Sequence, residues 1–231
     1  MIRAVLLDID NTLLDFDAYV QTAMKEGFEQ FGLGEYTEKT YEIFLSINGP
    51  LWHALEKKEI TYQELLQVRW NKVFAALDIT FDGLAFEKYF KGRLFHTAIP
   101  EQGAEKLLYY LQGRYILATA SNGPYDQQIN RLKISGMYDK MTHHFISEAM
   151  GVAKPAWEYF DYCLTEINRN LTDPIKPDEV LMIGDSLSSD IAGAKAYGMK
   201  TCFYDKQKKG DTKGLCPDYR VEQLEELLQI L

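Results

Sequence analysis

Five short apolar runs, each ending abruptly in polar residues, constrain this chain more than any other feature. The runs cover residues 4–7, 115–120, 144–146, 180–183 and 201–204. Their hydrophobicity is continuous rather than alternating, as parallel strands require when helices cover both faces of a sheet. The runs therefore predict buried strands of a parallel sheet.

Helical patterns lie between the later runs, at residues 104–112, 126–134, 157–167 and 189–197. Strands that alternate with helices are typical of βαβ units and of an open, doubly wound sheet. In such folds the ligand site lies beyond the carboxyl ends of the strands. We also expect Gly198 to end the fourth helix and residues 221–231 to form a last amphipathic helix.

Residues 15–95 have a different character, because helical spacing dominates and no strand run is evident. Thr61 followed by Glu64 is typical of a capping box at the start of a helix. The sequence thus predicts an α/β core domain made of residues 1–14 and 96–231, with an inserted helical domain at residues 15–95. A polar, charged loop is expected at residues 206–213.

The composition narrows the classes of partner. A formal net charge of -9 disfavours a nucleic-acid polymer or an anionic membrane as a partner. Cys163, Cys202 and Cys216 are widely spaced and odd in number, which predicts neither a disulfide framework nor a zinc site. The first apolar run is too short for a signal peptide or membrane span, so we expect a cytoplasmic protein, either monomer or homodimer.

Two carboxylates, Asp8 and Asp10, follow the first apolar run directly. An isolated pair of this kind is more often a solvated turn than a site. Polar residues follow three other runs as well, however, and parallel strands bring such loops to one edge of the sheet. These residues are Ser121-Asn122-Gly123, Lys154-Pro155, and Gly184-Asp185-Ser186 with Asp190.

Each of these segments alone has a structural explanation as a turn, an exposed lysine or a helix cap. Together, and in this order, they resemble the haloacid dehalogenase-like (HAD) hydrolase superfamily. Residues 8–13 are similar to its DxDxT signature, and the three later segments to its second, third and fourth motifs. The insertion resembles the family's helical type 1 cap, so the resemblance implies a Rossmann-like core with a cap domain.

The resemblance implies a phosphatase with a phosphoaspartyl intermediate on Asp8. A phosphomonoester dianion repels an attacking carboxylate, so the site must supply positive charge. Mg²⁺ suits oxygen ligands, and Asp8 and Asp185 can provide two of them. By resemblance the Asp10 carbonyl is a further ligand and Asp190 supports the metal, through water or through Lys154.

The other motif residues would act on the transferring group. Lys154 would neutralise the nucleophile and the phosphoryl oxygens, while the Ser121 hydroxyl and the loop at Asn122 and Gly123 would hydrogen-bond the phosphoryl group. Asp10 is expected to protonate the leaving alkoxide and then to activate water.

Several alternatives remain. As the resemblance implies, an acidic residue at position 10 is present in the family's phosphatases and absent from its dehalogenases. Asp10 therefore favours a phosphatase, and a phosphomutase is the second choice. A non-catalytic phosphate-accepting or regulatory module of the receiver type would not need so long an insertion.

The insertion is expected to select the substrate. The order Asn48, Leu51-Trp52, Glu56, Ile60-Thr61 and Arg69 is similar to caps of bacterial pyrimidine 5′-nucleotidases. On this resemblance Asn48 and Trp52 would bind a nucleoside 5′-monophosphate, with Trp52 stacking on the base. The alternative is that these residues form the core of the cap and that the substrate is a sugar phosphate or phosphoglycolate.

Overall fold

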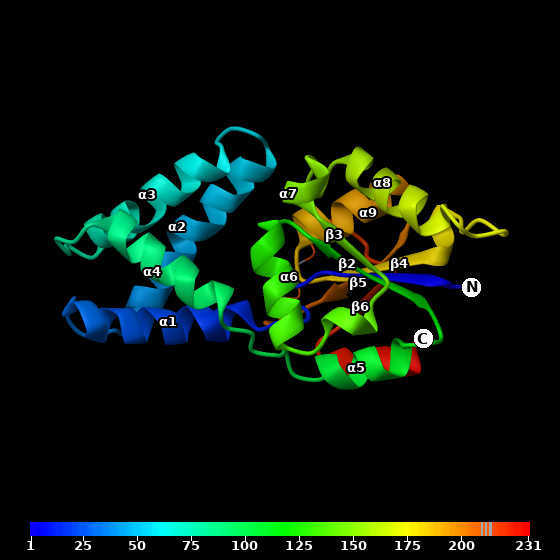
Figure 1. Cartoon of the computed structure of the whole chain (residues 1–231), viewed down its shortest axis with the longest axis horizontal. Coiled ribbons are helices and arrows are strands. Elements are labelled where there is room, and N and C mark those ends of the chain that lie inside the picture. The colour runs from blue at the N-terminus through cyan, green and yellow to red at the C-terminus, as the bar shows by residue number, and fades with distance from the viewer. Residues whose placement is uncertain (209, 211, 213) are drawn as a thin grey trace. The chain divides into compact units, whose positions relative to one another are not determined.

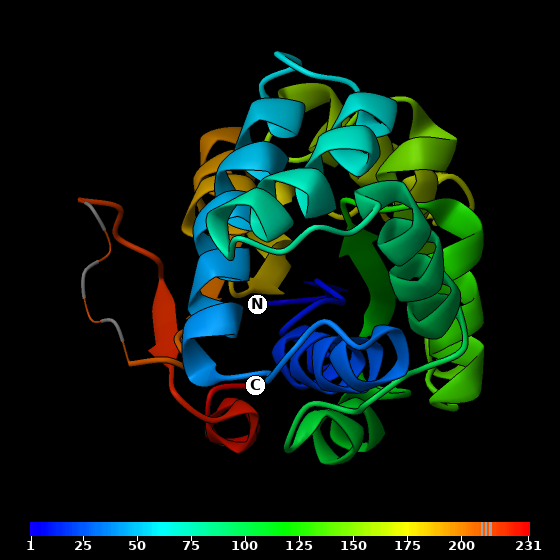
Figure 2. The ribbon, with the colours of Figure 1, turned by 90° about the vertical axis from the view of Figure 1, so that its left-hand side faces the viewer.

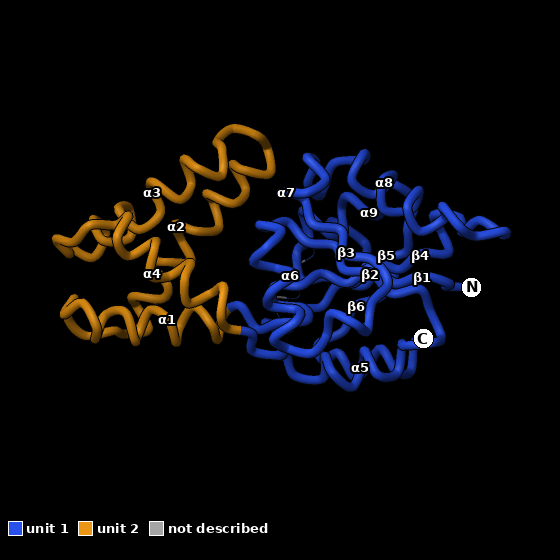
Figure 3. Tube along the Cα trace, viewed as in Figure 1, with its two compact units in different colours: residues 1–16, 98–231 blue, residues 17–97 orange. Residues whose placement is uncertain are grey.

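The computed structural model describes residues 1–208, 210, 212 and 214–231; positions 209, 211 and 213 of the loop predicted at 206–213 lie outside the described residues. The chain forms two compact units. Unit 1 comprises residues 1–16 and 98–231, and unit 2 comprises residues 17–97 (Figure 3).

Unit 1 is built on a six-stranded sheet of the order β3-β2-β1-β4-β5-β6, in which all neighbours are parallel (Figure 1). The strands are β1 (Ala4–Leu7), β2 (Ile116–Ser121), β3 (His143–Ile146), β4 (Val180–Gly184), β5 (Lys200–Tyr204) and β6 (Tyr219–Val221). The five strands predicted from apolar runs are confirmed, and the doubly wound α/β fold with them. Strand β6 was not predicted, because it is a three-residue edge strand with two exposed residues and no apolar run.

Helices cover both faces of this sheet, as the continuous apolar runs require. Val5 and Leu7 of β1 lie in one apolar cluster with helix α5, whereas Ala4 and Leu6 lie in another with helix α8. The helical elements of unit 1 are α5 (Ala104–Leu111), α6 (Tyr125–Ile134), η1 (Tyr138–Lys140), α7 (Ser147–Met150), α8 (Trp157–Asn168), η2 (Pro177–Glu179), η3 (Leu187–Ala192), α9 (Gly193–Tyr197) and η4 (Leu224–Gln229).

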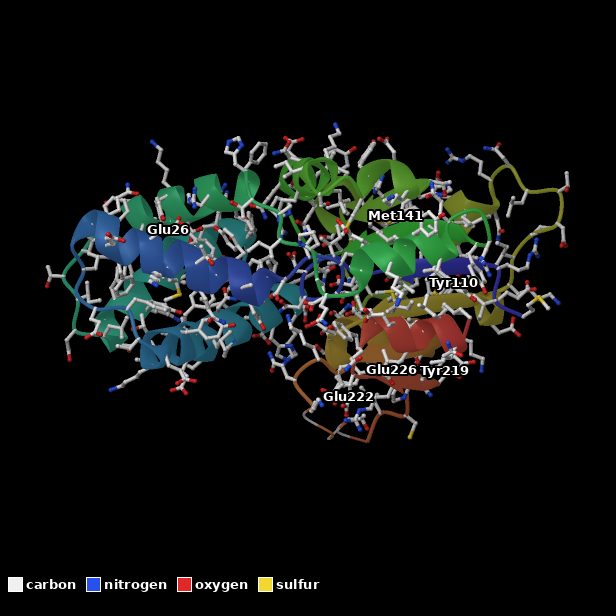
Figure 4. All side chains as sticks on the ribbon, turned by 90° about the horizontal axis from the view of Figure 1, so that it is seen from below. Glu26, Tyr110, Met141, Tyr219, Glu222 and Glu226 are labelled. Carbon is white, nitrogen blue, oxygen red and sulfur yellow. The ribbon has the colours of Figure 1, made fainter. Side chains whose placement is uncertain are left out.

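The C-terminal segment differs from its prediction, because the expected helix at residues 221–231 is wrong. Val221 belongs to β6 and pairs with Tyr204, and only a 3₁₀ helix, η4, follows. The buried Leu224 and Leu227 are three residues apart, which matches the three residues per turn of a 3₁₀ helix. Glu226 accepts a hydrogen bond from the backbone N–H of Glu222, and both glutamates are seen on this segment in Figure 4.

The segment after β4 also differs in detail from its prediction. The single helix expected at residues 189–197 is a π-helical turn, η3, that continues into α9. Ser186 caps it, since its side chain accepts from the Ser189 N–H at 3.2 Å. The predicted stop at Gly198 is confirmed by its left-handed φ of 99°.

Unit 2 consists of four helices that lie side by side (Figure 2): α1 (Phe16–Phe31), α2 (Glu38–Glu56), α3 (Tyr62–Ala76) and α4 (Gly83–Phe95). Buried aromatic rings fill the space between them, with Trp70 4.4 Å from Phe86 between ring centroids. The predicted capping box is confirmed, since the Glu64 N–H donates to Thr61 Oγ1 and the Thr61 N–H to Glu64 Oε2. Within the described residues, no helix has both the length and the apolar composition needed to cross a membrane.

At Gly193, α9 closely approaches the loop that carries Lys154. A Cβ there would lie 2.8 Å from Pro155 backbone atoms and 2.6 Å from the Phe160 ring, although the helical φ of Gly193 suits alanine. We expect Gly193→Ala to lower the free energy of unfolding by about 1–3 kcal/mol through overpacking. In the matched control Gly92→Ala, where nothing lies within 4 Å, the free energy should rise by up to about 1 kcal/mol. Urea unfolding followed by circular dichroism measures both, and equal stability of Gly193→Ala and wild type would contradict the packing.

Candidate active site

The carboxyl ends of β1, β2 and β4 bring the predicted motif residues together. These strands are neighbours in the sheet, and the Asp8 N–H donates to the Ile183 carbonyl at 2.9 Å, so Asp8 continues the register of β1 against β4. Ser121 ends β2, and Asp185 directly follows β4. The sheet edge predicted from the sequence is therefore where these side chains lie.

Lys154 is the central cation of this edge. Its ammonium donates to Asp8 Oδ1 at 2.7 Å, to Asp190 Oδ1 at 2.6 Å and to the Ala120 carbonyl at 2.5 Å. An ammonium has three hydrogens, so these contacts use all of its donors. The side chain is 2% exposed, which makes the pairing necessary, since a buried charge without partners is strongly unfavourable.

A group of three carboxylates fits a divalent cation. Asp8, Asp185 and Asp190 each offer an oxygen, and these atoms lie within 4.8 Å of one another. Lys154 contributes one positive charge against three carboxylates, so the cluster retains an excess of negative charge. Oxygen donors and excess negative charge are what Mg²⁺ requires. The carboxylates of Asp8, Asp185 and Asp190 are thus brought together, and the predicted role of the Asp10 backbone carbonyl as a further ligand stays a prediction.

Asp190 reaches this cluster because Gly184 has no side chain. A Cβ on Gly184 would lie 2.1 Å from Asp190 Oδ2, which in turn accepts from the Ser186 N–H at 3.0 Å. With Lys154 on its other oxygen, the Asp190 carboxylate is held at both atoms. Asp190 thus contacts Lys154, as expected if it supports the metal through Lys154 rather than through water.

Burial makes the Asp8 carboxylate hard to ionise without nearby positive charge. Burial raises the pKa of Asp8 from 3.8 to about 7; Asp190 and Asp10 add to the rise, and Lys154 offsets only part of it. Burial by itself would lower the pKa of Lys154, but Asp190 and Asp8 outweigh it and raise that pKa. The lysine therefore stays charged, and a bound divalent cation would favour the ionised form of Asp8.

Two residues of α6 that the sequence analysis missed bind Asp10. Arg131 NH1 donates to Asp10 Oδ1 at 2.6 Å, and Gln128 Nε2 donates to Asp10 Oδ2 at 2.7 Å. The same Nε2 also donates to Ser121 Oγ at 2.8 Å. The signal was a glutamine and an arginine three residues apart on the helix that follows the Ser121 motif, which places both on one helix face.

Asn122 holds the backbone of Lys154. Its Nδ2 donates to the Lys154 carbonyl at 2.8 Å, and its Oδ1 accepts from the Lys154 N–H at 2.9 Å. Gly123 lies against Gln128, whose side chain would be 3.2 Å from an added Cβ. The predicted contacts of Asn122 and Gly123 with substrate stay predictions, and the observed contacts show that this loop positions other site residues.

The residues predicted to contact the leaving group lie in unit 2. Asn48 is buried, and its Oδ1 accepts from Arg69 NH1 at 3.1 Å. Arg69 also forms a buried ion pair with Glu87 at 2.6 Å. Trp52 is only partly buried, with its ring 6.1 Å from that of Tyr62. Asn48 and Arg69 thus have a structural duty inside the unit, whereas Trp52 retains exposed surface.

Known proteins are similar to this chain in sequence and in fold. The sequence profile of the haloacid dehalogenase-like hydrolases matches residues 2–198. HAD-hydrolase YfnB of Bacillus subtilis is 31% identical over 229 residues, which cover 99% of this chain and 95% of YfnB. Pyrimidine 5′-nucleotidase PynA of Streptococcus pneumoniae is also 31% identical, over 99% of this chain and 94% of PynA. A crystal structure of YfnB bound to magnesium matches with a TM-score of 0.88 at 30% identity, covering all of this chain and 98% of the other.

The raised pKa of Asp8 predicts how stability depends on pH when metal is removed. With a pKa of about 7 in the folded chain and 3.8 as its ordinary value, Asp8 holds a proton near pH 5 that the unfolded chain has released. Stability in EDTA should therefore fall as pH rises, by about 2 kcal/mol between pH 5 and pH 7.5. Urea unfolding at both pH values measures this. Asp8→Asn should remove most of the dependence, whereas exposed Asp126→Asn should keep it; an unchanged slope in Asp8→Asn would contradict the assignment.

Proposed function

Since the chain belongs to the haloacid dehalogenase-like hydrolase family, we propose that it hydrolyses a phosphomonoester with Asp8 as nucleophile and Mg²⁺ as cofactor. The family and the enzyme class predicted from the sequence, a phosphatase, are confirmed. The observation that carries the proposed mechanism is the contact between Lys154 and Asp8 within a cluster of three carboxylates.

The side chains support a two-step reaction. Asp8 and Asp185, with support from Asp190, would hold Mg²⁺, which would supply positive charge for the phosphoryl oxygens. Lys154 fixes Asp8 Oδ1 at 2.7 Å and orients the carboxylate before attack. One Asp8 oxygen attacks phosphorus, and the bond to the leaving oxygen breaks.

Asp10 and Ser121 complete the proposed reaction. Asp10 gives its proton to the leaving alkoxide and then takes one from water. That water attacks the phosphorus of the phosphoaspartyl group and releases inorganic phosphate, which restores the Asp8 carboxylate. The Ser121 hydroxyl hydrogen-bonds the transferring group.

We propose that unit 2 is the cap that selects the leaving group. We further propose that the substrate is a nucleoside 5′-monophosphate. Two relatives support this substrate class: PynA, and pyrimidine 5′-nucleotidase YjjG of Escherichia coli, which is 29% identical over 98% of this chain and 96% of YjjG. Trp52 keeps exposed surface on which a base could stack. Three free cysteines, two of them buried, suit a cytoplasmic enzyme.

A substrate panel tests this proposal. The panel measures phosphate release with Mg²⁺ from pyrimidine nucleoside 5′-monophosphates, purine nucleoside 5′-monophosphates, sugar phosphates and phosphoglycolate. We expect kcat/KM to be at least about tenfold higher for the pyrimidine nucleotides than for the others, because base contacts outside the core site add binding energy. EDTA and Asp8→Asn should each abolish release. Equal kcat/KM across the panel would contradict the nucleotidase assignment, and an active Asp8→Asn would contradict the nucleophile.

A further inference from the structure

We propose that Gln128 and Arg131 are positioning residues that join Asp10 and Ser121 into one hydrogen-bonded unit. This inference rests on the proposed function and adds two residues to it. Both side chains come from α6, three residues apart, and both are at most 1% exposed. The Asp10 side chain is 32% exposed, so the pair holds it from the buried side and leaves its other side open.

The chemistry of the partners fixes the orientation of the Gln128 amide. Arg131 NH1 lies 2.8 Å from Gln128 Oε1, and a guanidinium can only donate, so this amide atom must be the oxygen. The amide nitrogen then faces Asp10 Oδ2 at 2.7 Å and Ser121 Oγ at 2.8 Å. Both hydrogens of this nitrogen are used, one on each partner.

This orientation determines what Ser121 can do. An amide nitrogen only donates, so Ser121 Oγ accepts from Gln128 and its own hydrogen is left to donate to another atom. A phosphoryl oxygen is an acceptor of that kind. Gln128 thereby makes Ser121 a hydrogen-bond donor toward the transferring group.

The same network holds both oxygens of Asp10. Arg131 NH1 donates to Oδ1 at 2.6 Å while Gln128 donates to Oδ2. Each carboxylate oxygen has two acceptor sites, so one contact per oxygen leaves sites on the exposed side. A fixed carboxyl group transfers a proton to the leaving oxygen more efficiently than one that rotates freely. Because Arg131 is buried, its charge needs this partner, and the orientation persists.

The two arms of the network predict different effects of substitution. Arg131 NH1 donates to Asp10 and to Gln128, so the loss of Arg131 should impair proton transfer to the leaving group. Gln128 donates directly to both Asp10 and Ser121, and its loss should also weaken the binding of the transferring group. A merely structural role would reduce all activities by the same factor.

Two probes with different leaving groups separate these effects. Cytidine 5′-monophosphate releases an alkoxide that needs a proton, whereas 4-nitrophenyl phosphate releases a stable phenolate that does not. The value of kcat/KM reports the steps up to departure of the leaving group, and the ratio of two such values is independent of the fraction of folded enzyme.

We expect Arg131→Met to lower kcat/KM at least about 100-fold for cytidine 5′-monophosphate and less than about tenfold for 4-nitrophenyl phosphate, because general acid catalysis contributes 10²–10⁴-fold. Arg131→Lys keeps a donor cation and should restore part of the ratio. Gln128→Leu should lower both values. The control Lys133→Met removes an exposed cation from the same helix and should change neither.

The outcomes distinguish this inference from the proposed function. If wild type releases phosphate from both probes and Arg131→Met loses the same factor on each, Arg131 has no positioning role and the inference is overturned. If Arg131→Lys shows no recovery of the ratio relative to Arg131→Met, the inference is overturned as well. If wild type releases phosphate from neither probe, the proposed function fails, and the inference fails with it.

Discussion

The buried Lys154 ammonium is the interaction on which the site depends. It joins Asp8 after β1, the Ala120 carbonyl of β2 and Asp190 of η3, so one cation ties together three segments that are distant in the sequence. A buried ammonium is tolerated only when its hydrogens are all bonded and its charge is balanced. The strand ends are therefore held in place by the same contacts that orient Asp8, the proposed nucleophile.

The site has two polar clusters with different charge balance. The cluster around Lys154 has three carboxylates and one cation, and burial makes Asp8 hard to ionise without further positive charge. The cluster around Asp10 has its own cation, Arg131. A divalent cation would balance the charge of the first cluster, where we propose that the phosphoryl group is attacked, whereas Arg131 already pairs with Asp10 in the second.

Sequence patterns predicted the parts of this structure that depend on local or repeated features. Apolar runs indicated the five longer strands, and the Thr61 capping box indicated the start of α3. The short strand β6 depends on pairing with β5, and Leu224 and Leu227 of the 3₁₀ helix after it lie in one apolar cluster with α5; no local pattern encodes either contact. Motif residues at strand ends were predicted to meet, and Asp8, Ser121, Lys154 and Asp185 lie at the same sheet edge. Arg131 was missed because a charged residue in a helix is normally exposed, and only the tertiary fold shows that it is buried.

Trapping the covalent intermediate tests the central claim, that Asp8 is the nucleophile oriented by Lys154. Wild-type protein mixed with Mg²⁺ and its best substrate is quenched in acid within a single turnover, and the peptides are mapped by mass spectrometry. The account predicts one phosphoryl group on the peptide that contains Asp8 in the wild type and none in Asp8→Asn. A phosphoryl group on Ser121, or steady phosphate release with no labelled peptide at any time, would contradict it.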